Sequence, residues 1–206
     1  MKKYFKATIQ ILYGYHIYSL PILFFEFYYF IKYQNKYNNF KYSNSKSLSD
    51  SIPCSFFFLQ KIEKFIKNKK LQIICDLGSG YGKTIHFLGN IKKYKIDGYE
   101  LDKEIYQNSL SLKNKNICIY NKDILSPNIL KLKYQVFIVN DPLLKISDFK
   151  KLIDNLINIF NRKKFLILIN VDPKRQLYIY KNFEIIDSLI ISSKRNIFFC
   201  KIKTRS

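Results

Sequence analysis

The sequence has few of the residues that build metal centres. It contains two histidines, His16 and His86, and four cysteines that lie far apart and form no C-x-x-C pair. Zinc sites need Cys and His ligands at short spacings, and disulfide frameworks need an oxidising compartment. We therefore expect no metal site, no disulfide framework and a reducing compartment. Cys75 and Cys118 fall in apolar runs, so both are expected to be buried thiols.

Arginine is also scarce, although the formal net charge is +21. Only four of the 36 basic residues are arginine, there is one alanine, and Asn, Ile, Tyr, Phe and Lys recur throughout the chain. This skew is typical of AT-rich coding sequence. Surfaces that read phosphate favour arginine, whose planar guanidinium binds phosphate at two points. Nucleic acid as a partner stays open, but the composition supports it only weakly.

No repeat and no Gly/Ser/Pro-rich linker divides the chain of 206 residues. Its length and its 48% of hydrophobic residues predict one folded domain with an extension. The composition changes near residue 40, where a polar segment, residues 42–51, follows an aromatic-rich one. We expect an N-terminal helical extension over residues 1–45 and the main domain over residues 46–206.

The apolar stretch Ile9–Ile31 spans 23 residues, which is long enough to cross a bilayer. Pro21 and Glu26 interrupt it, and a central acid costs roughly 2.5–3.5 kcal/mol on insertion. No small-residue cleavage site follows, which argues against a secretory signal. Two interpretations stay open: a helix packed on the domain, where Glu26 can pair with a basic neighbour, or contact with the cytoplasmic face of the inner membrane. The sequence slightly favours packing.

From residue 71 onward, apolar runs of strand length alternate with segments of helical spacing, which predicts a parallel sheet covered on both faces. The predicted strands are Leu71–Cys75, Lys95–Tyr99, Asn116–Tyr120, Tyr134–Val139 and Phe165–Val171. The predicted helices are Phe56–Ile66, Lys83–Ile91, Lys103–Leu112 and Ser147–Phe160. Two last runs, Glu184–Ile191 and Asn196–Lys203, are joined too closely for anything but an antiparallel hairpin.

Acidic residues number only 15, and five of them fall at or just after the end of a predicted strand. These five are Asp76, Glu100, Asp123, Asp141 and Asp172. The carboxyl ends of the strands in an open α/β sheet form the edge where ligands bind. Acids also favour helix starts, and that alternative explains two or three of the five.

Three of the six glycines lie in the segment Asp76-Leu-Gly-Ser-Gly-Tyr-Gly82, between a predicted strand and a helix. A NAD-binding G-x-G-x-x-G pattern would need glycine at position 83, which is lysine. The observed pattern resembles the first motif of class I S-adenosylmethionine (SAM)-dependent methyltransferases. Glu100 lies 22 residues beyond Gly78 and ends the next strand, where an acid binds ribose hydroxyls in nucleotide-binding βαβ units.

The resemblance extends over Leu71 to about Lys203 and implies a Rossmann-like α/β fold with a mostly parallel, seven-stranded sheet closed by the antiparallel hairpin. It implies SAM as the cofactor, with Asp123 near the adenine. The residues expected to bind the cofactor are Asp76, Gly78, Ser79, Gly80, Gly82, Glu100, Leu101, Asp123 and Ile124.

The fourth predicted strand ends in Asn140-Asp-Pro-Leu143, which resembles the [DN]-P-P-[YF] motif of methyltransferases acting on amino nitrogen. It departs from that motif in Asp141 and Leu143, which leaves the acceptor atom open. Asn140, Asp141 and Pro142 are the catalytic candidates, with Asp141 or Asn140 orienting an amine. His86 is expected to be packed or exposed rather than catalytic.

A fainter resemblance links Ser51–Ser55, the glycine turn and the strand end at Glu100 to small lysine methyltransferases of mitochondria and bacteria. It implies a protein lysine as the methyl acceptor. RNA, a small molecule, or a non-catalytic protein with this fold are the alternatives. Because SAM is a cytosolic metabolite, the domain is expected to face the cytoplasm.

Overall fold

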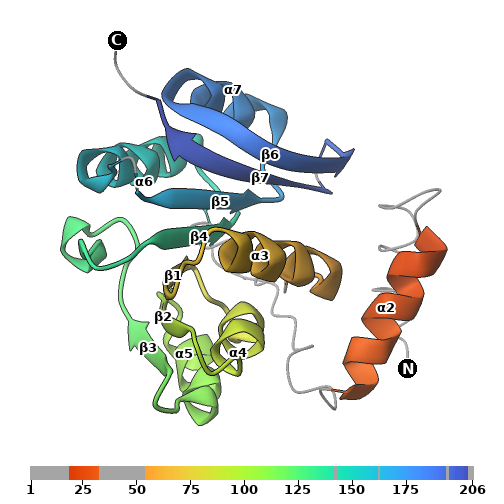
Figure 1. Ribbon diagram of the computed structural model, residues 1–206. Helices are drawn as coiled ribbons and strands as arrows, with labels where there is room; N and C mark the ends of the chain where they lie inside the picture. Colours follow the sequence, from red (N-terminus) through yellow and green to blue (C-terminus); the bar gives the residue numbers. More distant parts are fainter. Residues whose placement is uncertain (1–18, 33–53, 142, 162, 194, 204–206) are drawn as a thin grey trace.

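The computed structural model describes residues 19–32, 54–141, 143–161, 163–193 and 195–203. The predictions for the start of the apolar stretch, for the polar segment 42–51 and for Pro142 lie outside these residues. The described residues form a seven-stranded sheet flanked by helices, with the helix Ser19–Lys32 at one side (Figure 1).

The sheet has the strand order β3-β2-β1-β4-β5-β7-β6. The strands are β1 (Ile73–Leu77), β2 (Lys95–Glu100), β3 (Ile117–Asn121), β4 (Val136–Asn140), β5 (Phe165–Ile169), β6 (Phe183–Ser192) and β7 (Arg195–Ile202). Strands β1 to β5 are parallel, and β7 runs antiparallel to both β5 and β6. The predicted parallel sheet with a terminal antiparallel hairpin is therefore confirmed, with strand ends shifted by up to two residues.

The helices are α2 (Ser19–Lys32), α3 (Phe56–Asn68), α4 (Lys83–Gly89), α5 (Lys103–Ser109), α6 (Ile146–Ile159) and α7 (Pro173–Asn182), with short 3-10 turns at Leu110–Leu112 and Pro127–Ile129. The sequence did not predict α7. This helix buries only Arg175 and Ile179, so it lacks the apolar stripe by which helices are recognised. Its start signals are the N-cap Asp172, which accepts a hydrogen bond from the Arg175 N–H, and a proline in the first turn.

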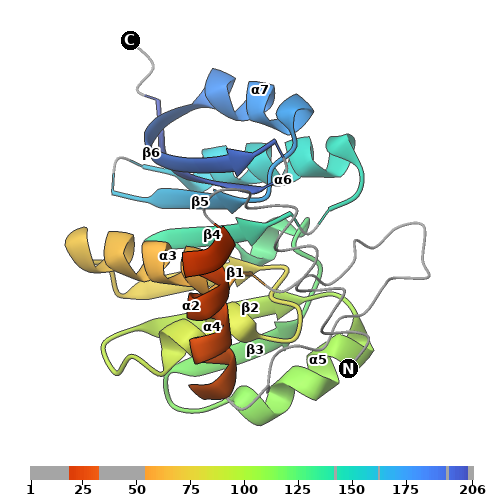
Figure 2. The ribbon, with the colours of Figure 1, turned by 90° about the vertical axis from the view of Figure 1, so that its right-hand side faces the viewer.

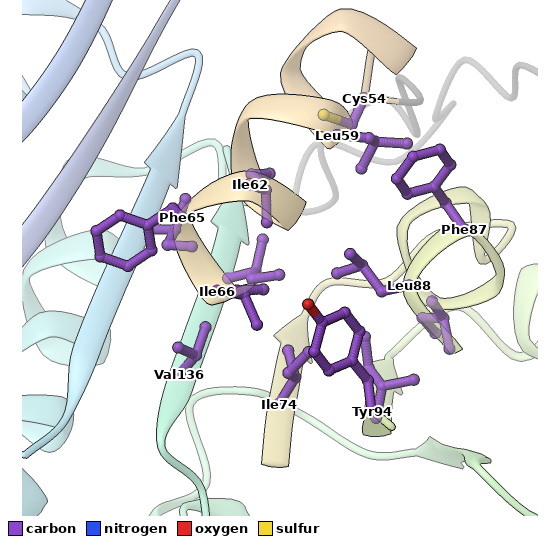
Figure 3. Close-up of a cluster of buried hydrophobic side chains, with 14 of the residues drawn as sticks. Cys54, Leu59, Ile62, Phe65, Ile66, Ile74, Phe87, Leu88, Tyr94 and Val136 are labelled. Atoms are coloured by element: carbon purple, nitrogen blue, oxygen red, sulfur yellow. The ribbon is translucent and has the colours of Figure 1, made fainter. Parts of the chain in front are cut away.

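Two hydrophobic cores lie on opposite faces of the sheet, one under α3 and α4 and the other under α6 and α7. In the first, Ile62 and Ile66 of α3 point toward Ile74 of β1 and Val136 of β4, and Leu59 lies beside Phe87 of α4 (Figure 3). The strands of this layered arrangement are buried on both faces, which explains their unalternating apolar sequences.

Helix α2 packs against α3 through polar and aromatic contacts, and Figure 2 shows it crossing in front of α3 and α4. The Glu26 carboxylate accepts a hydrogen bond from the Phe57 N–H at 2.8 Å, and Tyr29 accepts one from the Gln60 amide at 2.7 Å. The Tyr29 ring stacks on Phe56. Within the described residues, this segment thus contacts the domain, and no helix there is long and apolar enough to cross a membrane.

The cysteines divide between core and surface. Cys54, Cys75 and Cys200 are buried, whereas Cys118 is exposed. The prediction that Cys118 is a buried thiol is wrong because β3 is the edge strand, and it buries Ile117 and Ile119 on its other face. Burial raises the pKa of the Cys75 thiol, with a further rise from the Asp76 charge, which favours its protonated form.

Candidate cofactor and acceptor site

The candidate site lies at the carboxyl ends of β1, β2 and β4. Strand β1 pairs with β2 on one side and with β4 on the other, so successive connections leave the sheet in opposite directions at this point. Such a switch in strand order is where open α/β sheets bind ligands. The predicted residues of the glycine turn and the ends of β2 and β4 meet here.

The glycine turn has a backbone that non-glycine residues rarely adopt. Gly78, Gly80 and Gly82 have φ angles of 81°, 54° and 83°, in the left-handed region. The N–H groups of Gly78 and Ser79 both donate to the Tyr99 carbonyl at 2.9 Å, which fixes the turn against the end of β2. Gly82 then caps the start of α4. The turn is therefore held in place by backbone hydrogen bonds to β2.

Gly98, in the middle of β2, lets α4 and the turn pack closely on the sheet, and sequence reasoning gave it no role. A Cβ at Gly98 would lie 2.1 Å from the Ile85 Cδ1 and 3.1 Å from the Ser79 side chain. The Ser79 hydroxyl is buried and has no hydrogen-bond partner in the described part of the chain. A buried hydroxyl without a hydrogen bond lowers the stability of the fold unless a ligand or water bonds to it. The turn therefore fits a ligand with hydrogen-bonding groups.

The Glu100 carboxylate is tied to the glycine turn, a contact that the sequence did not predict. One oxygen accepts a hydrogen bond from the Gly80 N–H at 2.8 Å, and the other accepts one from the Asp102 N–H at 2.8 Å. Burial raises the pKa of Glu100, and these two bonds counteract the rise. The Leu101 N–H also contributes to this effect, and a carboxylate with about four acceptor positions keeps some of them for a ligand. The carboxylate is therefore oriented and can accept a pair of ligand hydroxyls.

Asp76 is the next-to-last residue of β1, just before the glycine turn, and is only 2% exposed. Burial, and secondarily the charge of Glu100, raises the pKa of Asp76 to about 7. A buried carboxyl group with this pKa is poised to pair with a positively charged group brought in by a ligand.

The residues predicted near the adenine lie on the loops after β2 and β3. The Asn121 amide donates to the carbonyls of Glu100 and Leu101 at 2.9 Å, which joins the two loops. Asp123 is exposed and accepts a hydrogen bond from the Leu125 N–H at 2.8 Å. Ile124 is buried in the core, and Leu101 is 48% exposed. Asp123 and Leu101 are thus accessible to a ligand, whereas the Ile124 side chain serves the fold.

Lys83, the first residue of α4, links the glycine turn to α2. Its ammonium lies 3.8 Å from the Glu26 carboxylate and 3.8 Å from the centre of the Phe56 ring. Both charged side chains are largely buried, and burial lowers the pKa of Lys83 and raises that of Glu26. This is the basic neighbour that the sequence led us to expect for Glu26.

At the end of β4, Asn140 lies beside Asn170, the residue that follows β5. The Asn170 amide donates to the Asn140 side-chain oxygen at 3.0 Å. Asp141 and Asn170 have φ angles of 38° and 58°, which are strained for residues with side chains. Pro142 lies outside the described residues. His86 of α4 contacts Asn90, the residue that caps the end of this helix, and is not part of this group.

Arg175 of α7 organises the loop after β4, and sequence reasoning missed it because α7 itself was missed. Its buried guanidinium forms an ion pair with Asp141 and donates to the carbonyls of Leu143 and, at 3.0 Å, Leu144. It also lies 3.1 Å from the Asp172 carboxylate. Asp172 is thus a helix cap and an ion-pair partner, so the helix-start alternative holds for this acid. Asp141 has a cation beside it, which limits its capacity to attract another.

Among the described residues, no group of three or more His, Cys, Asp or Glu side chains could hold a metal ion. Neither protein-family models nor curated proteins match this sequence. Solved structures do match, at low sequence identity.

The methyltransferase domain of bacterial CtHen1 aligns with a TM-score of 0.60 and 12% identity over 71% of this chain and 97% of that domain. A ribosomal protein L11 methylase from Lactobacillus delbrueckii subsp. bulgaricus gives 0.59 and 13%, over 74% of this chain and 81% of that one. An RNA methyltransferase from Salinibacter ruber, solved with S-adenosyl-L-homocysteine, gives 0.57 and 13%, over 75% and 96%. The chain has the Rossmann-like fold of class I SAM-dependent methyltransferases.

Proposed function

We propose that this protein is a SAM-dependent methyltransferase acting on an amine. The observation that carries the proposal is the Glu100 carboxylate held on a left-handed glycine turn, 2.8 Å from the Gly80 N–H, beside a buried Asp76. Such an arrangement suits a ligand that carries ribose hydroxyls and a positive charge, and SAM has both. Three similar structures are methyltransferases by name, and one of them was solved with the demethylated product.

The fit with SAM rests on this chain's own groups. The Glu100 carboxylate keeps acceptor capacity for the ribose hydroxyls, and the Ser79 hydroxyl needs a partner. Asp76 offers a buried negative charge for the amino group or the sulfonium. Asp123, exposed after β3, can accept from the adenine amino group. When bound, SAM supplies an activated methyl group, whose in-line transfer to an amine forms the N–C bond as the C–S bond breaks with its electron pair on sulfur.

The amine acceptor is proposed from the strand end at Asn140, which carries a side-chain oxygen able to accept an N–H bond. A protein lysine is the favoured acceptor, on the fainter resemblance of the turn and strand ends to lysine methyltransferases. RNA is the second candidate, because the chain carries a net charge of +21 and one similar structure is an RNA methyltransferase. The remaining alternatives are a small-molecule acceptor and a non-catalytic protein, and neither of these two arguments supports them.

Two experiments test the proposal. Calorimetry of the full chain should show SAM or its demethylated product binding at one site, with no response to NAD; NAD binding without SAM binding would refute it. Labelled SAM should then transfer its methyl group to a fraction of source-cell lysate. Protease treatment should remove the labelled product if the acceptor is a protein, and ribonuclease treatment should remove it if the acceptor is RNA.

A further inference from the structure

Asn170 occupies a position next to the proposed acceptor site that its role in the fold does not explain. It follows β5 directly, and β5 pairs with β4 in a register that places Ile169 opposite Asn140. The Asn170 amide nitrogen donates to the Asn140 side-chain oxygen at 3.0 Å. The two carboxamides therefore lie side by side at the carboxyl edge of the sheet, on neighbouring strands.

The side-chain oxygen of Asn170 is buried and has no hydrogen-bond partner within the described part of the chain. Buried acceptors in native proteins are satisfied in the great majority of cases, and an unsatisfied one is a cost to the fold. The natural partner for a lone buried acceptor at a ligand-binding edge is an N–H or O–H group that arrives with a ligand.

The backbone at Asn170 is also unfavourable for this residue and is held by other groups. Its φ of 58° lies in the left-handed region, where glycine has no steric penalty. The Asn170 N–H donates to the Asn196 carbonyl at 2.8 Å, and the fully buried Asn196 side chain bonds both the N–H and the carbonyl of Val171 at 2.9 Å. The strand end is therefore fixed without the Asn170 side chain. Asparagine tolerates this conformation better than most residues, but that tolerance does not supply a partner for its oxygen.

We propose that the Asn170 side-chain oxygen accepts an N–H bond from the methyl acceptor, beside Asn140, so that two carboxamides orient the attacking nitrogen. The proposal rests on the proposed function and names a further residue of its acceptor site. A neutral carboxamide accepts an N–H bond without favouring the charged ammonium as a carboxylate would. Because Arg175 pairs with Asp141, the nearest acid does not restore that bias. The site thus favours the neutral amine, the form that has a lone pair.

The test uses a pair of cofactor analogues, so it does not depend on knowing the acceptor. Sinefungin carries an amino group where SAM carries its methyl-bearing sulfonium, and S-adenosyl-L-homocysteine has a neutral thioether at that position, with neither the charge nor an amine there. Calorimetry measures the affinity of the full chain for each compound. In Asn170→Gly, we expect the preference for sinefungin to fall roughly three- to tenfold, as the loss of one hydrogen bond implies. Affinity for S-adenosyl-L-homocysteine should change less than about twofold.

The matched control is Lys70→Gly, which replaces another left-handed residue, with φ of 56°, between α3 and β1, at the opposite edge of the sheet. It should leave both affinities unchanged. Asn170→Asp keeps an acceptor oxygen and adds a negative charge, so it should raise the preference for sinefungin. Both Asn170 variants should melt within about 4 °C of the parent or above it.

Three results would overturn the proposal. The first is normal binding of both analogues with an unchanged preference in both Asn170 variants. The second is loss of folding in Asn170→Gly but not in Lys70→Gly, which would show that Asn170 serves the fold. The third is no binding of either analogue to the parent protein, which would refute the proposed function and this inference with it. Because this result is measured on the parent protein, it is distinguished from failure of the Asn170 proposal, which is measured on the variants.

Discussion

The guanidinium of Arg175 and the carboxylate of Asp141 form an ion pair that ties the first turn of α7 to the loop after β4. The Arg175 side chain is 6% exposed and that of Asp141 is 37% exposed, so the cation is the buried partner. The same guanidinium lies 5.3 Å from the centre of the Phe149 ring and donates to two loop carbonyls. One side chain thus sets the conformation of the loop that carries the predicted acceptor motif.

Replacing Arg175 should therefore destabilise the protein more than replacing Asp141. Arg175→Met leaves the Leu143 and Leu144 carbonyls without their donor, and we expect a loss of about 3 kcal/mol in the free energy of unfolding. Asp141→Asn leaves those two bonds in place and should cost about 1 kcal/mol. Urea unfolding of both variants, and of Arg175→Lys for comparison, measures the difference in the free energy of unfolding. Equal losses in Arg175→Met and Asp141→Asn would contradict the role given to the carbonyl bonds.

Replacing Glu100 should weaken SAM binding without unfolding the domain. Hydrogen bonds to a charged group contribute about 1.5–3 kcal/mol, so Glu100→Ala should lower the affinity by roughly ten- to hundredfold. Calorimetry measures this, and Glu104→Ala, four residues along on exposed helix α5, is the control. Unchanged affinity in a folded Glu100→Ala protein would show that the ribose site has been misplaced.

The raised pKa of Asp76 predicts a loss of stability as the pH rises. In the unfolded chain this carboxyl titrates near its ordinary value, whereas in the folded protein its pKa is about 7. Between these values the folded state holds a proton that the unfolded state has lost, so stability falls from about pH 4 to pH 7 and is level above that range. The shift corresponds to at most about 4 kcal/mol.

Denaturant unfolding across pH 4 to 8 measures this slope. Asp76→Asn should remove the part that Asp76 contributes and be the more stable protein at pH 8, while the raised pKa values of Glu26 and Glu100 leave a smaller slope of the same sign. A wild-type slope that survives undiminished in Asp76→Asn would assign the titration to another group. A positively charged ligand should lower the same pKa, so SAM should bind more tightly above pH 7 than below it and release protons on binding.

The features that the sequence predicted correctly are those encoded within short segments. The unalternating apolar strands, the glycine turn from Gly78 to Gly82, and the short connection before β7 each have a local signature. Glu100 could be placed because the spacing from a glycine turn to the end of the next strand varies little in βαβ units. In the structure its carboxylate accepts a hydrogen bond from the Gly80 N–H, and its binding to ribose stays a prediction.

The features that the sequence did not predict depend on contacts between distant segments. Arg175 contacts Asp141 across 34 positions, and no local pattern indicates that the two meet. The contact between Asn170 and Asn140 follows only from the pairing of β5 with β4. Cys118 was misplaced because its exposure follows from the position of β3 at the sheet edge, which is a matter of strand order.

The contact between Glu26 and Lys83 leads to a last prediction, about the N-terminal helix. Both side chains are largely buried, and Glu26 also accepts from the Phe57 N–H. Glu26→Ala would leave the Lys83 ammonium buried without its partner, which should cost about 3 kcal/mol in the free energy of unfolding. The double variant Glu26→Gln, Lys83→Met removes both charges, keeps an acceptor for Phe57 and should recover most of that loss. A double variant as unstable as Glu26→Ala would show that the loss does not come from the unpaired Lys83 charge.

Deletion of residues 1–40 extends the same argument to the whole segment. If α2 packs on the domain in solution as it does in the structure, the deletion exposes the Phe56 ring and leaves Lys83 unpaired, so the truncated protein should be insoluble or unstable. The other face of α2 presents Phe24, Phe27 and Tyr28 to the surface, each more than half exposed, and is compatible with a membrane surface. An anchor role predicts instead that the full chain resists alkaline carbonate extraction and that the truncated protein is soluble and binds SAM. The two outcomes are mutually exclusive, and the buried Glu26–Lys83 pair favours the first.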